Sequence, residues 1–232
     1  MNRLAIIFIL CAFAQGVIVD PLSSRQQAAF KQINFLPSEM RSGKIGVGDL
    51  ALVFLDSGVS SHEDLSGRFN LLITKDLEDL KGHGTAVTGI AAAITGNAAG
   101  IKGISRQADV IPIRVNKVNE DGILYTDKEE VFRAIASLQN LPYRLLVVNM
   151  SFALWEGSTA EKKRWEDLMF SLKDKALFVV GAGNDPYQNT EDIYPCAASH
   201  LPNVICVGGV DSKDSFQSSG SSRGKEVNIS AP

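Results

Sequence analysis

The stretch that decides the fold is Leu50-Ala51-Leu52-Val53-Phe54-Leu55-Asp56-Ser57-Gly58, in which an apolar run ends in an acid and a glycine turn. A short continuous apolar run is typical of a strand buried on both faces of a sheet. Further strands are expected at 110–115, 145–150, 177–180 and 204–207. Stretches with helical spacing lie between them. This alternation predicts an α/β fold with three layers, α/β/α, around a mostly parallel central sheet.

Three helices are expected to cover this sheet. In the first, we expect Val87, Ile90, Ala91 and Ile94 to form one apolar face. Asp127 with Glu130, and Ser158 with Glu161, have the spacing of capping boxes that begin two more helices. The apolar stripes of these two are expected to pack in the core; they comprise Val131, Ala134, Ile135 and Leu138, and Trp165, Leu168, Met169 and Leu172.

Polar residues follow the predicted strands at the points where the strands end. The three segments are Asp56-Ser57-Gly58, Asn149-Met150-Ser151 and Gly183-Asn184-Asp185. In open parallel sheets, ligands bind outside the carboxyl ends of the strands. An acid, a serine and an amide at this edge therefore predict a functional site there.

A histidine between glycines, Gly82-His83-Gly84-Thr85, opens the first predicted helix. Glycines leave the imidazole unobstructed and let the backbone pass close to its neighbours. A histidine paired with a buried carboxylate can act as a general base, because the carboxylate fixes the tautomer of the ring. Asp56 is the expected partner. A histidine that merely packs or caps a helix is the alternative for this motif taken alone.

Several segments, in the same order, resemble the subtilisin-like serine proteases over residues 26–232. They are LVFLDSGV at 52–59, GHGTAVTG at 82–89, VNMSF at 148–152, VGAGND at 180–185, Tyr194-Pro195, NVICVG at 203–208 and ISAP at 229–232. The resemblance implies a subtilisin-like fold, incomplete at the C-terminal end, and hydrolysis of peptide bonds by an Asp/His/Ser triad.

The resemblance also implies a role for individual residues. Asp56 would orient His83, His83 would act as the base, and Asn184 would donate its side-chain amide to the oxyanion. Ser151, Phe152, Ala153 and Gly183 would line a groove for an extended polypeptide substrate. Phe152 and Ala153 stand where the family usually has Leu-Gly, which leaves the side-chain preference open.

No cofactor and no metal-binding residues are expected. Asp64 and Asn97 resemble parts of the calcium site of the family. An Asx turn at Asn97 is the alternative, and we favour it.

The triad serine of the family lies in a Gly-Thr-Ser-Met-Ala segment that has no match in these 232 residues. Gly220-Ser221-Ser222-Arg223-Gly224 matches the Gly-x-Ser-x-Gly elbow, but an elbow needs a helix to follow, and Val227 and Ile229 alternate as in a strand. We therefore interpret Ser222 as part of a turn.

The chain by itself is expected to be inactive. We weigh three readings: a fragment of a protease, a pseudoprotease that binds extended peptides, and a half-enzyme whose serine comes from a partner in trans.

Composition and the first residues bear on location. The formal net charge of −3 gives no sign of a basic nucleic-acid-binding protein, and no nucleic-acid partner is expected. Arg3, the apolar run 4–13 and the small residues Ala12 and Ala14 predict a cleaved signal peptide at 1–14, followed by a partial peptidase domain at 15–232. We expect a secreted or periplasmic protein without a membrane partner after cleavage. In such an oxidising compartment, Cys196 and Cys206 can form a disulfide; the alternative is that both remain buried free thiols.

Overall fold

The computed structural model describes residues 20–35, 49–70, 77–106, 108–215 and 220–232. The predicted signal peptide at 1–14 lies outside these ranges. Within them, none of the helices combines the length and the apolar character that crossing a bilayer requires.

The centre of the fold is a six-stranded sheet in the order β10-β9-β7-β5-β1-β2. Every neighbouring pair in it is parallel. The strands are β1 (Leu50–Asp56), β2 (Asp109–Arg114), β5 (Leu145–Met150), β7 (Ala176–Gly181), β9 (Val204–Gly209) and β10 (Ile229–Ala231). From β1 the chain first adds β2 on one side and later β5 on the other. The carboxyl ends of β1 and β5 therefore flank the topological switch point, where open α/β sheets bind ligands.

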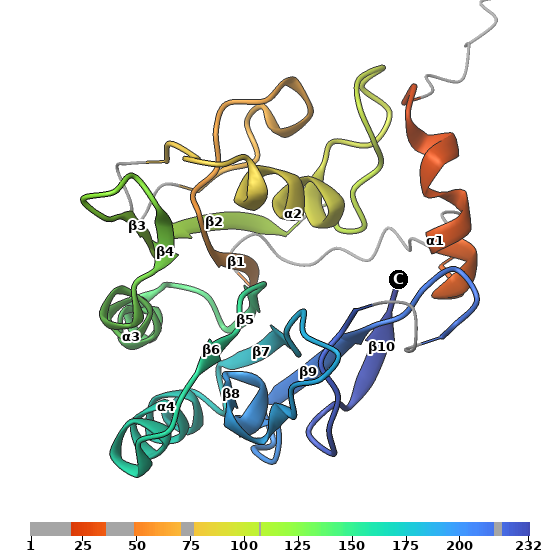
Figure 1. Ribbon diagram of the computed structural model, residues 1–232. Helices are drawn as coiled ribbons and strands as arrows, with labels where there is room; N and C mark the ends of the chain where they lie inside the picture. The colour runs from red at the N-terminus through yellow and green to blue at the C-terminus, as the bar shows by residue number, and fades with distance from the viewer. Residues whose placement is uncertain (1–19, 36–48, 71–76, 107, 216–219) are drawn as a thin grey trace, which may run out of the picture.

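Helices cover the two faces, which confirms the predicted three-layer α/β/α fold. Helix α2 (His83–Ala92) lies on one face, and α3 (Lys128–Ser137) and α4 (Thr159–Ser171) lie on the other (Figure 1). A short helix, α1 (Gln27–Gln32), lies at one edge of the molecule. The smaller elements are the antiparallel pairs β3 (Asn116–Val118) with β4 (Leu124–Thr126) and β6 (Leu154–Trp155) with β8 (Ile193–Tyr194).

The side chains of β1 alternate between two cores. Ala51, Val53 and Leu55 belong to the large cluster on the α3 and α4 side, and Phe54 belongs to a small cluster with Ala92 and Val110 on the α2 side. The predicted N-terminal caps of α3 and α4, the two helices that pack on the large cluster, are confirmed. Asp127 accepts a hydrogen bond from the Glu130 amide at 3.0 Å, and Ser158 accepts one from the Glu161 amide at 3.5 Å. All eight residues of the two predicted stripes pack in this cluster or against it, Leu138 and Leu172 from the positions just after α3 and α4; the eight are Val131, Ala134, Ile135, Leu138, Trp165, Leu168, Met169 and Leu172.

The predicted apolar face of α2 is confirmed for Val87 and Ala91, which pack against the small cluster, and is wrong for Ile90 and Ile94. Ile90 is 56% exposed, and Ile94 lies beyond the last residue of the helix, Ala92. The buried residues are instead Gly84, Thr88 and Ala92, one helical turn apart. Small side chains let the helix approach the sheet closely, so Gly84, Thr88 and Ala92 are buried more completely than the larger Ile90.

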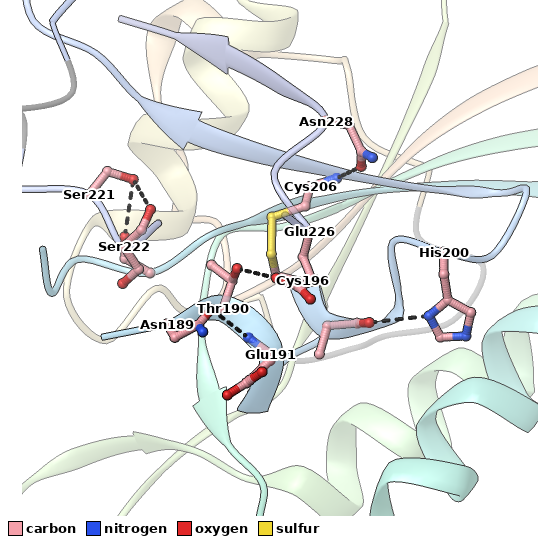
Figure 2. Close-up of a disulfide and its surroundings, with 12 residues drawn as sticks. Asn189, Thr190, Glu191, Cys196, His200, Cys206, Ser221, Ser222, Glu226 and Asn228 are labelled. Atoms are coloured by element: carbon pink, nitrogen blue, oxygen red, sulfur yellow. Dashed lines mark hydrogen bonds between the residues drawn. A yellow bond between two sulfur atoms is a disulfide. The ribbon is translucent and has the colours of Figure 1, made fainter. Parts of the chain in front are cut away.

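Cys196 and Cys206 form a disulfide, which decides between the two readings of these cysteines. It joins a short turn after β8 to the middle of β9, and both residues are fully buried. The bond therefore ties the segment that follows the Asn184 loop to the central sheet (Figure 2).

Candidate active site

Asp56 and His83 are in direct contact. Asp56 is the last residue of β1 and is 4% exposed, whereas His83 is the first residue of α2. The imidazole Nδ1 lies 2.7 Å from Oδ1 of Asp56, and the Ser57 amide donates to the same oxygen at 2.7 Å. The His83 side chain is 55% exposed. A buried carboxylate therefore holds one ring nitrogen of an imidazole that faces solvent, the arrangement that suits a general base.

Glycine at position 84 permits this contact. A Cβ on Gly84 would lie 2.1 Å from the carbonyl oxygen of Gly58, far closer than atoms can approach. The first turn of α2 therefore rests directly on the chain that leaves β1. Any larger residue at position 84 would push the helix, and His83 with it, away from Asp56.

A second carboxylate, Asp79, organises the start of α2. It accepts five hydrogen bonds, from the Ser57 hydroxyl at 2.7 Å, the amides of Lys81 and Gly82 at 3.1 and 2.8 Å, and the amide and hydroxyl of Thr85 at 2.8 and 2.6 Å. Burial alone would raise the pKa of Asp79, but the hydrogen bonds from Thr85, Ser57 and Lys81 outweigh it and hold the pKa below its ordinary value. The Ser57 hydroxyl also accepts from the Gly84 amide at 2.9 Å. Asp79 thus links the end of β1 to the start of α2.

Sequence reasoning missed Asp79. The available signal was an acid four residues before the first residue of a helix, in the region where carboxylates satisfy free backbone amides.

The other predicted residues meet His83 in one cleft. The cleft has a volume of about 650 Å³ and is lined by His83, Val87, Ser151, Phe152, Ala153, Trp155, Gly181, Gly183, Asn184, Asp185, Gln188 and Ile193. All the residues predicted for the oxyanion hole and the groove are among them. A smaller recess of about 270 Å³ adjoins it, sharing His83, Ser151 and Phe152 and adding Asp56 and Lys81. Trp155, which is 69% exposed, was not predicted as part of the site.

Asn184 lies in an exposed loop just after β7. Gly183 before it has a φ of +102°, and a Cβ there would lie 2.8 Å from the hydroxyl oxygen of Ser222. Ser222 itself is fully buried. In keeping with the turn interpretation, the segment after it leads to the strand β10 rather than to a helix.

The predicted Asx turn at Asn97 is confirmed. Its side-chain oxygen accepts from the Ala99 amide at 3.0 Å, and its side-chain amide donates to Asp64 at 3.1 Å. Asp64 also accepts from the Ile101 amide at 2.8 Å. In the described part of the chain, no group of three or more His, Cys, Asp or Glu residues lies where it could hold a metal ion.

Known proteins share both the sequence pattern and the fold. Residues 50–232 match the family model described as the subtilase family. The chain is 30% identical over 209 residues to the minor extracellular protease Epr of Bacillus subtilis (strain 168), covering 88% of this chain and 30% of that protein. It is 27% identical over 191 residues to thermitase of Thermoactinomyces vulgaris, covering 78% and 62%. The chain thus spans less than two thirds of both relatives.

Solved structures agree on the fold. A protease of Pseudoalteromonas arctica superposes with a TM-score of 0.69 at 21% identity, covering 93% of this chain and 72% of that one. Sphericase superposes with a TM-score of 0.58 at 25% identity, covering 80% and 66%. Because the family model matches most of the chain and includes both Asp56 and His83, the chain belongs to the subtilase family and forms a subtilisin-like protease domain.

Proposed function

We propose that this chain carries the base and the oxyanion donor of a secreted serine endopeptidase. The observation that carries the proposal is the 2.7 Å contact between His83 and Asp56 at a cleft that Asn184 also lines. Asp56 would hold the tautomer of His83 and stabilise the imidazolium. His83 would take the proton of a serine hydroxyl and return it to the leaving amine. The nucleophilic serine is assigned to no residue of this chain.

Asn184 would stabilise the tetrahedral intermediate. Its position in an exposed loop, in the same cleft as His83, suits a side-chain amide that donates to a developing oxyanion. A preorganised donor of this kind stabilises the transition state more than the ground state, so its removal lowers kcat rather than raising KM.

The substrate would be an extended polypeptide. The residues at 151–153 follow β5 directly, and together with Gly183 they line the same cleft as His83. An extended peptide laid along such a segment is held mainly by main-chain hydrogen bonds, with pockets for alternate side chains. Secretion is supported by the predicted signal peptide and by relatives named as extracellular proteases.

Hydrolysis of a fluorogenic peptide tests the proposal. The protein to assay is the whole polypeptide that the gene encodes, called the gene product below, as distinct from the 232-residue chain expressed alone. We expect His83→Ala to lower kcat by roughly 10⁶-fold and Asp56→Asn to lower it by roughly 10⁴-fold. Asn184→Ala is expected to lower kcat by about 10²–10³-fold, the loss known for this donor in subtilisin itself. His200→Gln, an exposed histidine outside the cleft, is the matched control and should retain activity. Hydrolysis that survives His83→Ala would refute the proposal.

Peptide binding separates an enzyme from a pseudoprotease. The chain has two tryptophans, of which Trp155 lines the cleft and is 69% exposed, whereas Trp165 is fully buried. A bound peptide should therefore change the fluorescence of Trp155, and Trp155→Phe should abolish the change. Binding without hydrolysis in the gene product would favour the pseudoprotease.

The 232-residue chain alone should not react with a fluorophosphonate, and labelling that is lost in Ser222→Ala would identify Ser222 as a nucleophile.

A further inference from the structure

We propose that Ser222 is a positioning residue that fixes Asn184 by bonding to the residues on both sides of it. This inference rests on the proposed role of Asn184 in the oxyanion hole. The Ser222 amide donates to the carbonyl oxygen of Gly183 at 3.0 Å. The Asp185 amide in turn donates to the hydroxyl oxygen of Ser222 at 3.1 Å. One side chain and its own amide thus hold the two neighbours of Asn184.

The loop needs such an anchor. Asn184 and Asp185 are exposed, and Gly183 adopts a left-handed conformation in which the chain turns away from β7. Exposed loops with few buried contacts are the first parts of a protein to open locally. An oxyanion donor contributes to catalysis only if it is already aimed at the reacting oxygen. A loop free to move would spend part of its time with Asn184 misdirected.

Ser222 is itself held in place, because the residues before and after it, Ser221 and Arg223, form hydrogen bonds to other segments. The Ser221 hydroxyl accepts from the Gly209 amide at the end of β9, at 3.0 Å. On the other side, the Arg223 carbonyl accepts from the Thr190 amide at 3.1 Å, and the Arg223 amide donates to the Gln188 carbonyl at 3.3 Å. Figure 2 shows Ser221 and Ser222 in one view with the Thr190–Glu226 hydrogen bond and the Cys196–Cys206 disulfide.

The fit between the two loops is also steric. Ser222 is fully buried, and a Cβ at position 183 would meet its hydroxyl oxygen at 2.8 Å. The Gly-x-Ser-x-Gly pattern at 220–224 thus serves to bring a buried serine against the backbone of the Asn184 loop. The hydroxyl is used as a hydrogen-bond acceptor there, and no nucleophilic role is needed to explain the motif.

Hydrogen exchange tests the contact without requiring catalysis. In the gene product, the Asp185 amide should exchange slowly, although Asp185 is exposed. Ser222→Ala should speed its exchange by roughly tenfold, the amount expected for the loss of one hydrogen bond. Thr190→Val removes another fully buried hydroxyl, which bonds to Glu226 at 2.7 Å, and is the matched control; it should leave the Asp185 amide protected. Unchanged exchange in Ser222→Ala would overturn the inference whether or not the protein is an enzyme.

A double-mutant cycle tests the link to catalysis. Ser222→Ala should lower kcat by about tenfold with KM unchanged. In the Asn184→Ala background the same substitution should change kcat by less than about twofold, because the residue that it positions is gone. Equal losses in both backgrounds would show that Ser222 acts through general stability and would overturn the inference. A gene product that hydrolyses no peptide would refute the proposed function, and the exchange result would still decide whether Ser222 holds the loop.

Discussion

Nδ1 of His83 lies 2.7 Å from Oδ1 of Asp56, although 27 positions separate the two residues in the chain. The end of a central strand supplies the carboxylate, and the first residue of the covering helix supplies the imidazole. Asp79 binds both segments through Ser57 and Thr85. The pair is therefore positioned by regular structure and a shared hydrogen-bond network, so its geometry does not have to be created when a substrate binds.

Asp79→Asn should destabilise the protein at neutral pH and reduce its sensitivity to acid. The pKa of Asp79 in the folded state is held below its ordinary value of 3.8 by hydrogen bonds from Thr85, Ser57 and the Lys81 amide. A lowered folded-state pKa contributes stability above 3.8, and this contribution is lost as the pH falls through the folded-state value. We expect Asp79→Asn to cost about 1–3 kcal/mol at neutral pH.

Urea unfolding of the gene product across this pH range measures the effect. The difference in unfolding free energy between wild type and Asp79→Asn should shrink below pH 3.8. Asp121→Asn changes an exposed acid between β3 and β4 and should match wild type throughout. A difference that is independent of pH would contradict the role of the Asp79 charge.

Removal of the disulfide should lower stability without rearranging the sheet. The Cys196–Cys206 bond spans 10 positions, and closing a loop of that length stabilises a protein by about 2–3 kcal/mol. Cys196→Ser with Cys206→Ser should lower the Tm by roughly 5–10 °C. Calorimetry with and without a reductant checks this, since only wild type should respond. An unchanged Tm in the double variant would contradict the expectation.

The 232-residue chain expressed alone should expose apolar surface and self-associate. On the α2 side of the sheet, Leu177 is 36% and Ile229 is 52% exposed. The partly exposed Val179, Ile205 and Val207 lie on the same face, because Val179 is in register with Ile205 and Ile229 with Val207. Contiguous apolar patches of this kind are rare on soluble monomers.

Dye binding and sedimentation test this expectation. The chain should bind the dye ANS and form aggregates, and Leu177→Glu should reduce both effects. A soluble monomer that melts cooperatively and binds no dye would contradict it, and would favour a self-sufficient binding module over a fragment of an enzyme.

The layers of the fold and the pairing of Asp56 with His83 could be predicted because their signals are local. Leu145–Met150 is a strand at the predicted residues, and the apolar run beginning at Leu50 is a strand that extends through Asp56. Each is a continuous apolar run that only a buried strand accommodates well. His83 and Asn184 were found from short motifs at strand and helix ends. Their meeting in one cleft follows from parallel topology, which brings such ends to one edge of the sheet.

What could not be predicted depends on contacts between distant segments. The buried face of α2 is set by how closely the helix approaches the sheet, and that favours Gly84 and Thr88 over Ile90. The hydroxyl of Ser222 bonds to an amide 37 positions away. Asp79 likewise bonds to Ser57, 22 positions away. The spacing of residues along a single segment carries no information about such pairs.

The low-field proton NMR spectrum of the gene product tests the central claim, the hydrogen bond between His83 and Asp56, most directly. The resonance of the His83 Nδ1 proton can be assigned by substituting each of the three histidines of these 232 residues in turn. We predict a low-field resonance that persists in His62→Gln and His200→Gln and disappears in both His83→Ala and Asp56→Asn. A spectrum without such a resonance, or one in which it survives Asp56→Asn, would contradict the account.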